Sequence, residues 1–133
     1  MVLDLRTDRS LVRAGGASVR HLLVSLTAPQ TPPGPDRQPL HLALVLDRSG
    51  SMGGAKIQLA REAVRQALQA LRPDDRFSLV VYDDQVDTVV ACTPASAEAR
   101  RAALRQLNRI EARGSTDLHG GWLAGCDQAA AAL

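Results

Sequence analysis

Hydrophobic positions in the second part of the chain follow two periods, one typical of strands and one typical of helices. Residues 42–46, 77–82 and 86–91 are short, mostly apolar runs of the kind that form buried strands. Residues 56–71, and two later segments between Pro94 and the end of the sequence, repeat apolar residues every three or four positions. The predicted order is strand, helix, strand, strand, helix, helix, which is typical of an α/β fold.

The connections between these elements predict their directions and ends. Residues 83–85 are too few for a crossover, so the strand at 86–91 should run antiparallel to the strand before it. Thr93 and Pro94 predict the start of the next helix, with a capping hydroxyl followed by proline at the first helical position. We expect Gly114 to close this helix, whose apolar stripe is Leu104, Leu107 and Ile110.

The first part of the chain has a different pattern, which predicts three regions in all. Residues 1–28 carry two apolar stretches around Gly15 and Gly16, and we interpret them as a β-hairpin with Leu11 and Val12 on one arm and residues 19–26 on the other. Residues 29–39 are rich in proline and predict an extended linker or loop. Residues 40–133 form the α/β region.

A small group of polar side chains follows the first strand of the α/β region. The apolar run 42–46 ends in Asp47, and two hydroxyls follow at alternate positions, Ser49 and Ser51. Buried parallel strands present such residues at the carboxyl edge of a sheet, where open α/β folds bind ligands. Clustered hard oxygen atoms suit Mg²⁺, although the same residues could also cap the following helix.

The D-x-S-x-S spacing resembles the metal-ion-dependent adhesion site of von Willebrand factor A domains. The family also places a threonine in a Gly-rich loop before a later helix, and Thr116 lies in such a context within Gly-Ser-Thr-Asp-Leu. The resemblance implies a Rossmann-like, doubly wound sheet of which residues 40–133 form the N-terminal part. It also implies that Ser49, Ser51 and Thr116 are metal ligands and that Asp47 holds the ion, often through water. The expected ion is Mg²⁺, with Mn²⁺ or Ca²⁺ as substitutes.

One element of the family pattern is absent from the sequence. The family normally carries a further Asp after the next buried strand, and the sequence stops at Leu133 before any such strand. We therefore expect a domain that is incomplete on its C-terminal side, with one open edge on the strand at 42–46. Another chain, a swapped copy or a missing C-terminal part would complete the sheet, and another chain could bring the missing carboxylate.

The resemblance predicts a protein-binding module rather than an enzyme. The metal would recruit a carboxylate from a protein partner that donates an acidic residue. Two alternatives stay open: a hydrolase or phosphotransferase that uses Asp47 or Ser51 as the nucleophile, and a structural fragment that binds no metal. Near matches to a P-loop and to a nucleophile elbow at residues 49–57 each lack a required residue.

Composition excludes some classes of protein and favours others. Basic residues are scattered and aromatic residues make up 2% of the chain, so we expect no nucleic-acid partner. No apolar stretch is long enough for a membrane span, and the first residues lack the pattern of a secretory signal, which favours a cytoplasmic protein of bacterial type without direct membrane insertion. Cys92 and Cys126 are expected to be buried, reduced thiols.

The sequence also supports expectations for five further side chains in the α/β region. Asp83 and Asp84 are expected to be solvated in the hairpin turn, with a role as a substitute carboxylate as the alternative. Asp117 should cap the last helix. The resemblance implies that Arg48 points into the loop between the ligands and shapes the choice of partner. We expect Trp122 to lie in the core.

Overall fold

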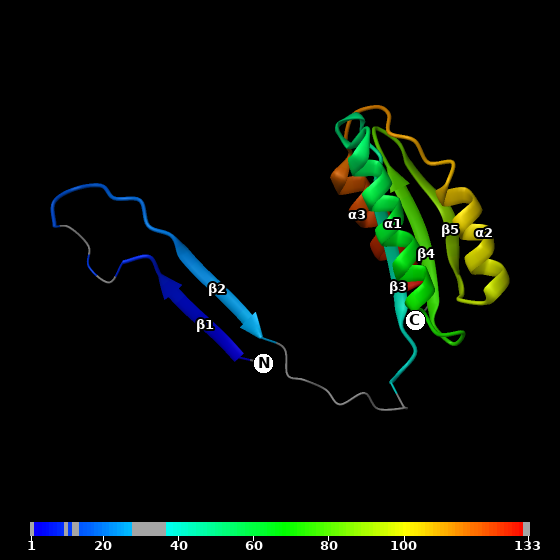
Figure 1. Cartoon of the computed structure of the whole chain (residues 1–133), viewed down its shortest axis with the longest axis horizontal. Helices are drawn as coiled ribbons and strands as arrows, with labels where there is room; N and C mark the ends of the chain where they lie inside the picture. Colours follow the sequence, from blue (N-terminus) through cyan, green and yellow to red (C-terminus); the bar gives the residue numbers. More distant parts are fainter. Residues whose placement is uncertain (1, 10, 12–13, 28–36, 132–133) are drawn as a thin grey trace. The chain divides into compact units, whose positions relative to one another are not determined.

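The computed structural model describes residues 2–9, 11, 14–27 and 37–131, which fall into two units (Figure 1). Unit 1 spans Met1–Arg37 and unit 2 spans Gln38–Leu133. The linker expected at residues 29–39 lies largely outside the described residues.

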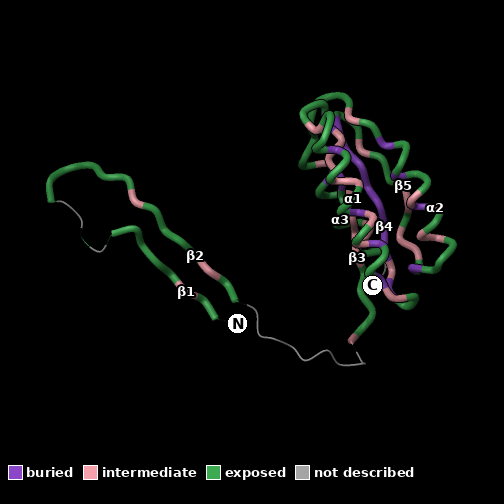
Figure 2. Tube along the Cα trace, in the orientation of Figure 1, coloured by how far each residue is buried: buried purple, intermediate pink, exposed green. Residues whose placement is uncertain are grey.

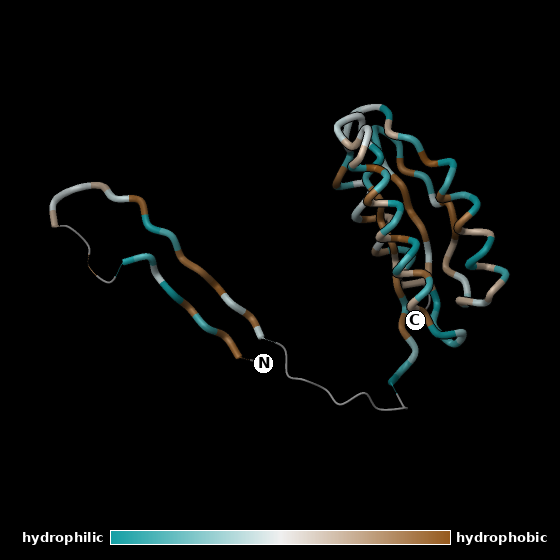
Figure 3. Tube along the Cα trace, in the orientation of Figure 1, coloured by the Kyte–Doolittle hydropathy of each residue, from teal (hydrophilic) through white to brown (hydrophobic). Residues whose placement is uncertain are grey.

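Unit 1 contains a two-stranded antiparallel sheet of β1 (Val2–Thr7) and β2 (Leu22–Thr27). The expected hairpin is present, but its first arm is β1: Leu11 lies in the connection between the strands, and Val12 is outside the described residues. Apolar side chains on both strands are exposed. Figure 2 shows the exposure of the two strands, and Figure 3 shows their hydropathy. A hairpin of two strands that buries so little apolar surface is marginally stable in water.

Unit 2 is built on a three-stranded sheet with the strand order β3-β4-β5. Its strands are β3 (His41–Asp47), β4 (Arg76–Tyr82) and β5 (Val86–Pro94). The helices are α1 (Ala55–Ala70), α2 (Ala97–Leu107) and α3 (Leu118–Ala130), with a short 3₁₀ turn at Gly50–Met52. β3 and β4 are parallel, and β4 and β5 are antiparallel, as the short connection between them predicted.

The sheet is covered on both faces, with α1 and α2 on one side and α3 on the other (Figure 1). β4 is the central strand, and its side chains alternate between the two faces as the two-residue period of a strand requires. Phe77, Leu79 and Val81 join the core beneath α1 and α2. Tyr82 faces α3, where it meets Gly121. The α/β fold expected from the sequence is confirmed.

Two expectations about α2 were wrong. Thr93 and Pro94 belong to β5, where they pair with Phe77 and Arg76, and proline is tolerated there because β5 is an edge strand. The N-cap of α2 is Ser96, whose hydroxyl accepts a hydrogen bond of 3.1 Å from the backbone N–H of Ala99. Ile110 is buried as expected, although α2 ends before it and Gly114 follows several residues later.

β3 lies at the other edge of this sheet, and among the described residues it pairs with β4 alone. Beside this edge is a cavity of about 240 Å³, lined by Ala43, Val45, Trp122, Gly125, Cys126 and Ala129. Trp122 was expected in the core, but it is 67% exposed because no described element of unit 2 covers its side of α3. Cys126 is also exposed and Cys92 is half-buried, so the expectation of two buried thiols was wrong; both are unpaired.

Candidate metal and partner-binding site

The first part of the candidate site is formed by the turn that follows β3. Asp47 is the last residue of the strand, and its Oδ1 accepts a hydrogen bond of 2.7 Å from the backbone N–H of Ser49. This bond folds the chain back so that the hydroxyls of Ser49 and Ser51 lie 3.2 Å apart. Ser49 is buried, whereas Ser51 is exposed. The turn therefore directs two hydroxyls to one point at the carboxyl end of a parallel strand.

The segment that carries Thr116 is held against this turn by backbone hydrogen bonds. The N–H of Gly50 donates to the carbonyl of Gly114 over 3.0 Å, and the N–H of Arg113 donates to the carbonyl of Arg48 over 2.7 Å. Thr116 follows Gly114 by two residues and is exposed. The structure thus brings together the two segments that supply the four predicted site residues.

Gly114 makes the close approach of these segments possible. Its φ angle is +66°, in the region that favours glycine, and any side chain there would overlap the carboxylate of Asp84. Asp117 caps α3 as expected, because its Oδ1 accepts a hydrogen bond of 2.9 Å from the N–H of Gly120. His119, in the first turn of α3, is exposed.

Asp83 is completely buried, and the expectation that it is solvated in the hairpin turn was wrong. Its Oδ2 accepts hydrogen bonds from Arg48 Nε over 2.9 Å and from Arg113 Nε over 2.6 Å. Its Oδ1 accepts from the N–H of Gln85 over 2.7 Å. The carboxylate is therefore satisfied by two guanidinium groups and one backbone amide.

These contacts also fix the direction of Arg48. Its Nη2 lies 2.5 Å from Oδ2 of Asp87, and its side chain is only 11% exposed. The guanidinium of Arg48 is thus committed to two acids of this chain, and the expectation that it points between the metal ligands was wrong. Asp84, next to Asp83, remains exposed.

The pKa values of this cluster reflect its ion pairs. The hydrogen bond from Arg113, together with those from Gln85 and Arg48, lowers the pKa of Asp83 to about 2, although burial opposes this shift. The same pair raises the pKa of Arg113. Burial raises the pKa of the Tyr82 hydroxyl, and the nearby Asp47 carboxylate, to which it is hydrogen-bonded, adds to that effect. Asp83 is therefore ionised throughout the neutral range.

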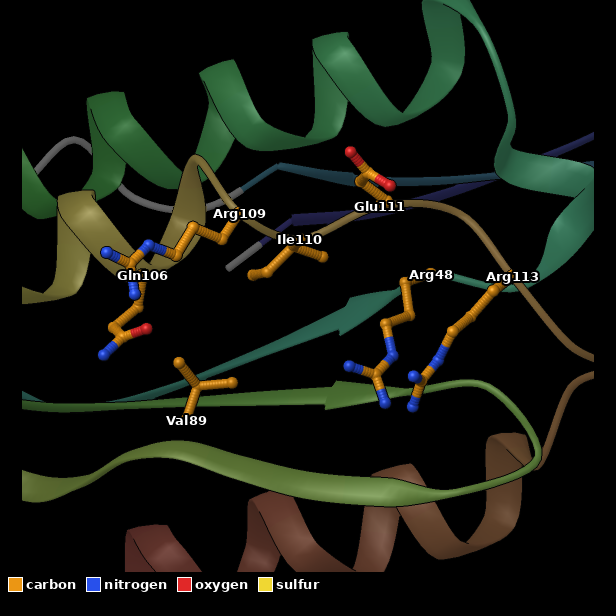
Figure 4. A pocket seen from close by; sticks show the side chains of 7 residues that line it. All are labelled: Arg48, Val89, Gln106, Arg109, Ile110, Glu111 and Arg113. Carbon is orange, nitrogen blue, oxygen red and sulfur yellow. The ribbon is translucent and has the colours of Figure 1, made fainter.

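A cavity of about 320 Å³ adjoins the ion-pair cluster, and Figure 4 shows the guanidinium groups of Arg48 and Arg113 side by side along it. Its remaining lining includes Val89 from β5 and Ile110 and Glu111 from the segment after α2. Because the two guanidinium groups are paired with the carboxylates of Asp83 and Asp87, their charge is largely neutralised within the protein.

The donor set fits a small, hard divalent cation that is bound mainly through hydroxyls. In an octahedral shell with bonds of about 2.1 Å, two adjacent ligand atoms lie roughly 3 Å apart, close to the separation of the Ser49 and Ser51 oxygens. Among the described residues, no group of three or more His, Cys, Asp or Glu side chains is arranged to hold a metal ion. Any metal at this site would therefore depend on Ser49, Ser51 and Thr116 as well as on Asp47.

Sequence reasoning missed Arg113 as part of the site and misjudged Asp83. A usable signal was present, because Asp83 directly follows the fully apolar end of β4, at the same edge of the sheet as Asp47. An acid at that position is close to the core and requires a cation. Which arginine would supply it depends on the path of the chain after α2, and no local pattern encodes that path.

Several proteins are similar in sequence to parts of this chain. A protein of Synechocystis sp. described as uncharacterized is 30% identical over 126 residues, or 95% of this chain and 29% of that protein. The human inter-alpha-trypsin inhibitor heavy chain H4 is 37% identical over 89 residues, or 66% of this chain and 10% of that protein. The chain therefore spans less than a third of the length of either relative.

Solved structures and a family profile agree with these relatives. The von Willebrand factor type A protein from Catenulispora acidiphila superposes with a TM-score of 0.62 and 27% identity, over 68% of this chain and 22% of that one. The corresponding domain of the type V pili tip protein Mfa5 from Porphyromonas gingivalis gives 0.60 at 20% identity, over 69% and 33%, and shows a shared fold. The profile of the von Willebrand factor type A domain matches residues 42–127. This chain belongs to the von Willebrand factor type A domain family.

Proposed function

We propose that unit 2 is a metal-dependent protein-binding module. The observation that carries this proposal is the pair of Ser49 and Ser51 hydroxyls, 3.2 Å apart at the end of β3 and joined to the Thr116 segment by the Gly50–Gly114 hydrogen bond. Ser49, Ser51, Thr116 and Asp47 hold Mg²⁺, or Mn²⁺ or Ca²⁺ in its place. The bound ion supplies a positive charge with an open coordination position.

The partner contributes an acidic side chain to that position. Neutral hydroxyls leave most of the charge of the ion uncompensated. A carboxylate therefore binds the ion more strongly here than at a site whose ligands are all carboxylates. Arg48 is the cationic side chain nearest in sequence to the ligands, and its pairing with Asp83 and Asp87 keeps it from replacing the metal as the carboxylate receptor. The membership of the family, which includes domains of pilus proteins, is consistent with an interaction role.

The open edge of β3 takes part in assembly. A strand from another chain, from a swapped copy or from a further part of the same protein completes the sheet there. Unpaired N–H and C=O groups at a sheet edge favour strand addition, and the adjacent cavity between Val45 and Trp122 offers apolar surface to the added element. A strand added parallel to β3 would end beside Asp47, from which position it could present a further carboxylate.

Titration calorimetry with Mg²⁺ tests the metal site. The unmodified chain should bind Mg²⁺, and Asp47→Ala and Thr116→Val should each lose most of that heat. Ser115→Ala is the matched control, because it removes a hydroxyl from the same segment without removing an assigned ligand. Equal binding by the unmodified chain and Asp47→Ala, or no binding by any variant at millimolar Mg²⁺, would refute the assignment.

A second titration tests the recruitment of a carboxylate. The probe is a short peptide with blocked termini whose one charged side chain is a central Glu, compared with the same peptide carrying Gln. Binding should require both Mg²⁺ and Glu, and EDTA should abolish it. Binding that is equal for the two peptides, or that survives EDTA, would show that the contact does not pass through the ion.

A further inference from the structure

We infer that Asp83 is a positioning residue that locks the two hydroxyl-bearing segments of the site together. The inference extends the proposed function, since it concerns how that site is held, but its geometry stands without any metal. Asp83 is neither a proposed ligand nor exposed to a partner. It lies behind the site, at the end of the central strand β4.

The carboxylate of Asp83 joins side chains from both segments. Arg48 is the residue between Asp47 and Ser49, and Arg113 directly precedes Gly114. Both donate through Nε to the same oxygen, Oδ2, over 2.9 and 2.6 Å. One buried oxygen therefore fixes the first ligand segment and the start of the second segment relative to β4.

Backbone bonds reinforce the same connection. The carbonyl of Asp83 accepts a hydrogen bond of 2.6 Å from the N–H of Asp117, which follows Thr116. The N–H of Arg113 bonds to the carbonyl of Arg48, and the N–H of Gly50 bonds to that of Gly114. Thr116 is thus flanked on both sides by residues that contact Asp83.

The energetic argument follows from burial. Two guanidinium groups approaching one point repel each other unless an anion lies between them, and a buried carboxylate supplies that charge. A neutral amide in its place has one acceptor oxygen and one NH₂ group, so either the two guanidinium groups or the N–H of Gln85 would face a donor, and the negative charge between Arg48 and Arg113 would be lost. The segment at 109–114 would then lose the ion pair of Arg113 with Asp83, and its backbone bonds to the turn at 48–50 would open more often.

Asp75 provides a matched control within the same strand region. It is also completely buried, and its carboxylate accepts hydrogen bonds from the N–H groups of Leu40 and Arg72 over 2.8 and 2.6 Å. It precedes β4, whereas Asp83 follows it, so the two acids lie at opposite ends of the same strand. Asp75→Asn therefore perturbs a buried acid without touching the site.

Amide hydrogen exchange in the metal-free chain is the primary test. Asp83→Asn should accelerate exchange at Gly50, Arg113 and Asp117 by roughly tenfold or more, which corresponds to the loss of charge-assisted hydrogen bonds. Amides in the β3–β4 ladder should change much less. Asp75→Asn should not accelerate exchange specifically at these three amides. Uniform acceleration over the whole sheet in Asp83→Asn, or no change at the three amides, would overturn the inference.

The Mg²⁺ titration supplies a second readout and separates the two proposals. If the unmodified chain binds Mg²⁺, Asp83→Asn should weaken binding by tenfold or more while Asp75→Asn leaves it within twofold. Equal affinity in both variants would overturn the positioning role. If the unmodified chain binds no Mg²⁺, the proposed function fails, and the exchange experiment still decides the role of Asp83.

Discussion

Gly121 of α3 packs directly on Tyr82 of β4, so closely that a side chain at this position would overlap the tyrosine ring. Gly125, one turn later, meets Val45 of β3 in the same way. These two contacts bring the helix axis close to the sheet. Because α3 begins at Leu118, two residues after Thr116, these contacts also fix the position of the Thr116 segment relative to the sheet.

We expect Gly121→Ala to destabilise the chain. Alanine would gain roughly 1 kcal/mol over glycine from helix propensity, but forcing a methyl group into packed atoms typically costs about 1–3 kcal/mol. Thermal and urea unfolding of the variant should give the net loss. Gly16→Ala is the matched control, since a methyl group there meets no atom within 4 Å. A stabilised Gly121→Ala would contradict this packing.

Acid should remove the contribution of Asp83 to stability. The pKa of Asp83 is lowered from 3.8 to about 2 in the folded chain, so the unfolded chain binds its proton first as the pH falls. The stabilisation is complete above the ordinary pKa and disappears as the pH drops through about 2. The difference in urea midpoint between the unmodified chain and Asp83→Asn should therefore be largest near neutral pH and shrink in strong acid. A difference that stays constant with pH would contradict the ion pairs.

The chain should not persist as a monomer of 14.2 kDa. The open edge of β3, the exposed Trp122 and Leu123 on α3, and the apolar arms of the hairpin all favour association. Light scattering should give a larger mass, and Trp122→Glu should reduce the self-association. A monodisperse monomer that unfolds cooperatively would show that these surfaces do not drive assembly.

A turnover screen tests the enzymatic alternative. Generic phosphate and ester substrates should give no rate above background, with or without Mg²⁺. Ser51→Ala and Asp47→Ala serve as controls for any activity that does appear. A rate that both substitutions abolish would favour the hydrolase or phosphotransferase interpretation over the binding module.

The succession of strands along unit 2 and the antiparallel direction of β5 could be predicted because each depends on local patterns. The apolar run ending in Asp47 identified β3, and the length of residues 83–85 determined the antiparallel turn. The start of α2 was predicted wrongly because Thr93 and Pro94 satisfy both a helix start and an edge strand, and pairing with β4 decides between them. Local sequence does not contain that pairing.

Some residues of the candidate site could likewise be predicted from the sequence, and others could not. Asp47, Ser49, Ser51 and Thr116 were assigned from their resemblance to the family motif, and the structure brings their two segments together. The buried state of Asp83 was missed because its solvation depends on Arg113, which is distant in sequence. The exposure of Trp122 was missed because an apolar stripe on α3 predicts a covered face but not what covers it.

The hydrogen bond from Gly50 to Gly114 has a consequence for the order of events during synthesis. It joins the beginning of the α/β unit to a segment that leaves the ribosome only after β4, β5 and α2. Contacts of such large sequence separation form late, since the entropy of closing the intervening loop must be overcome first. In a nascent chain, the Thr116 segment therefore joins the turn that carries Ser49 and Ser51 only after β4, β5 and α2 have emerged.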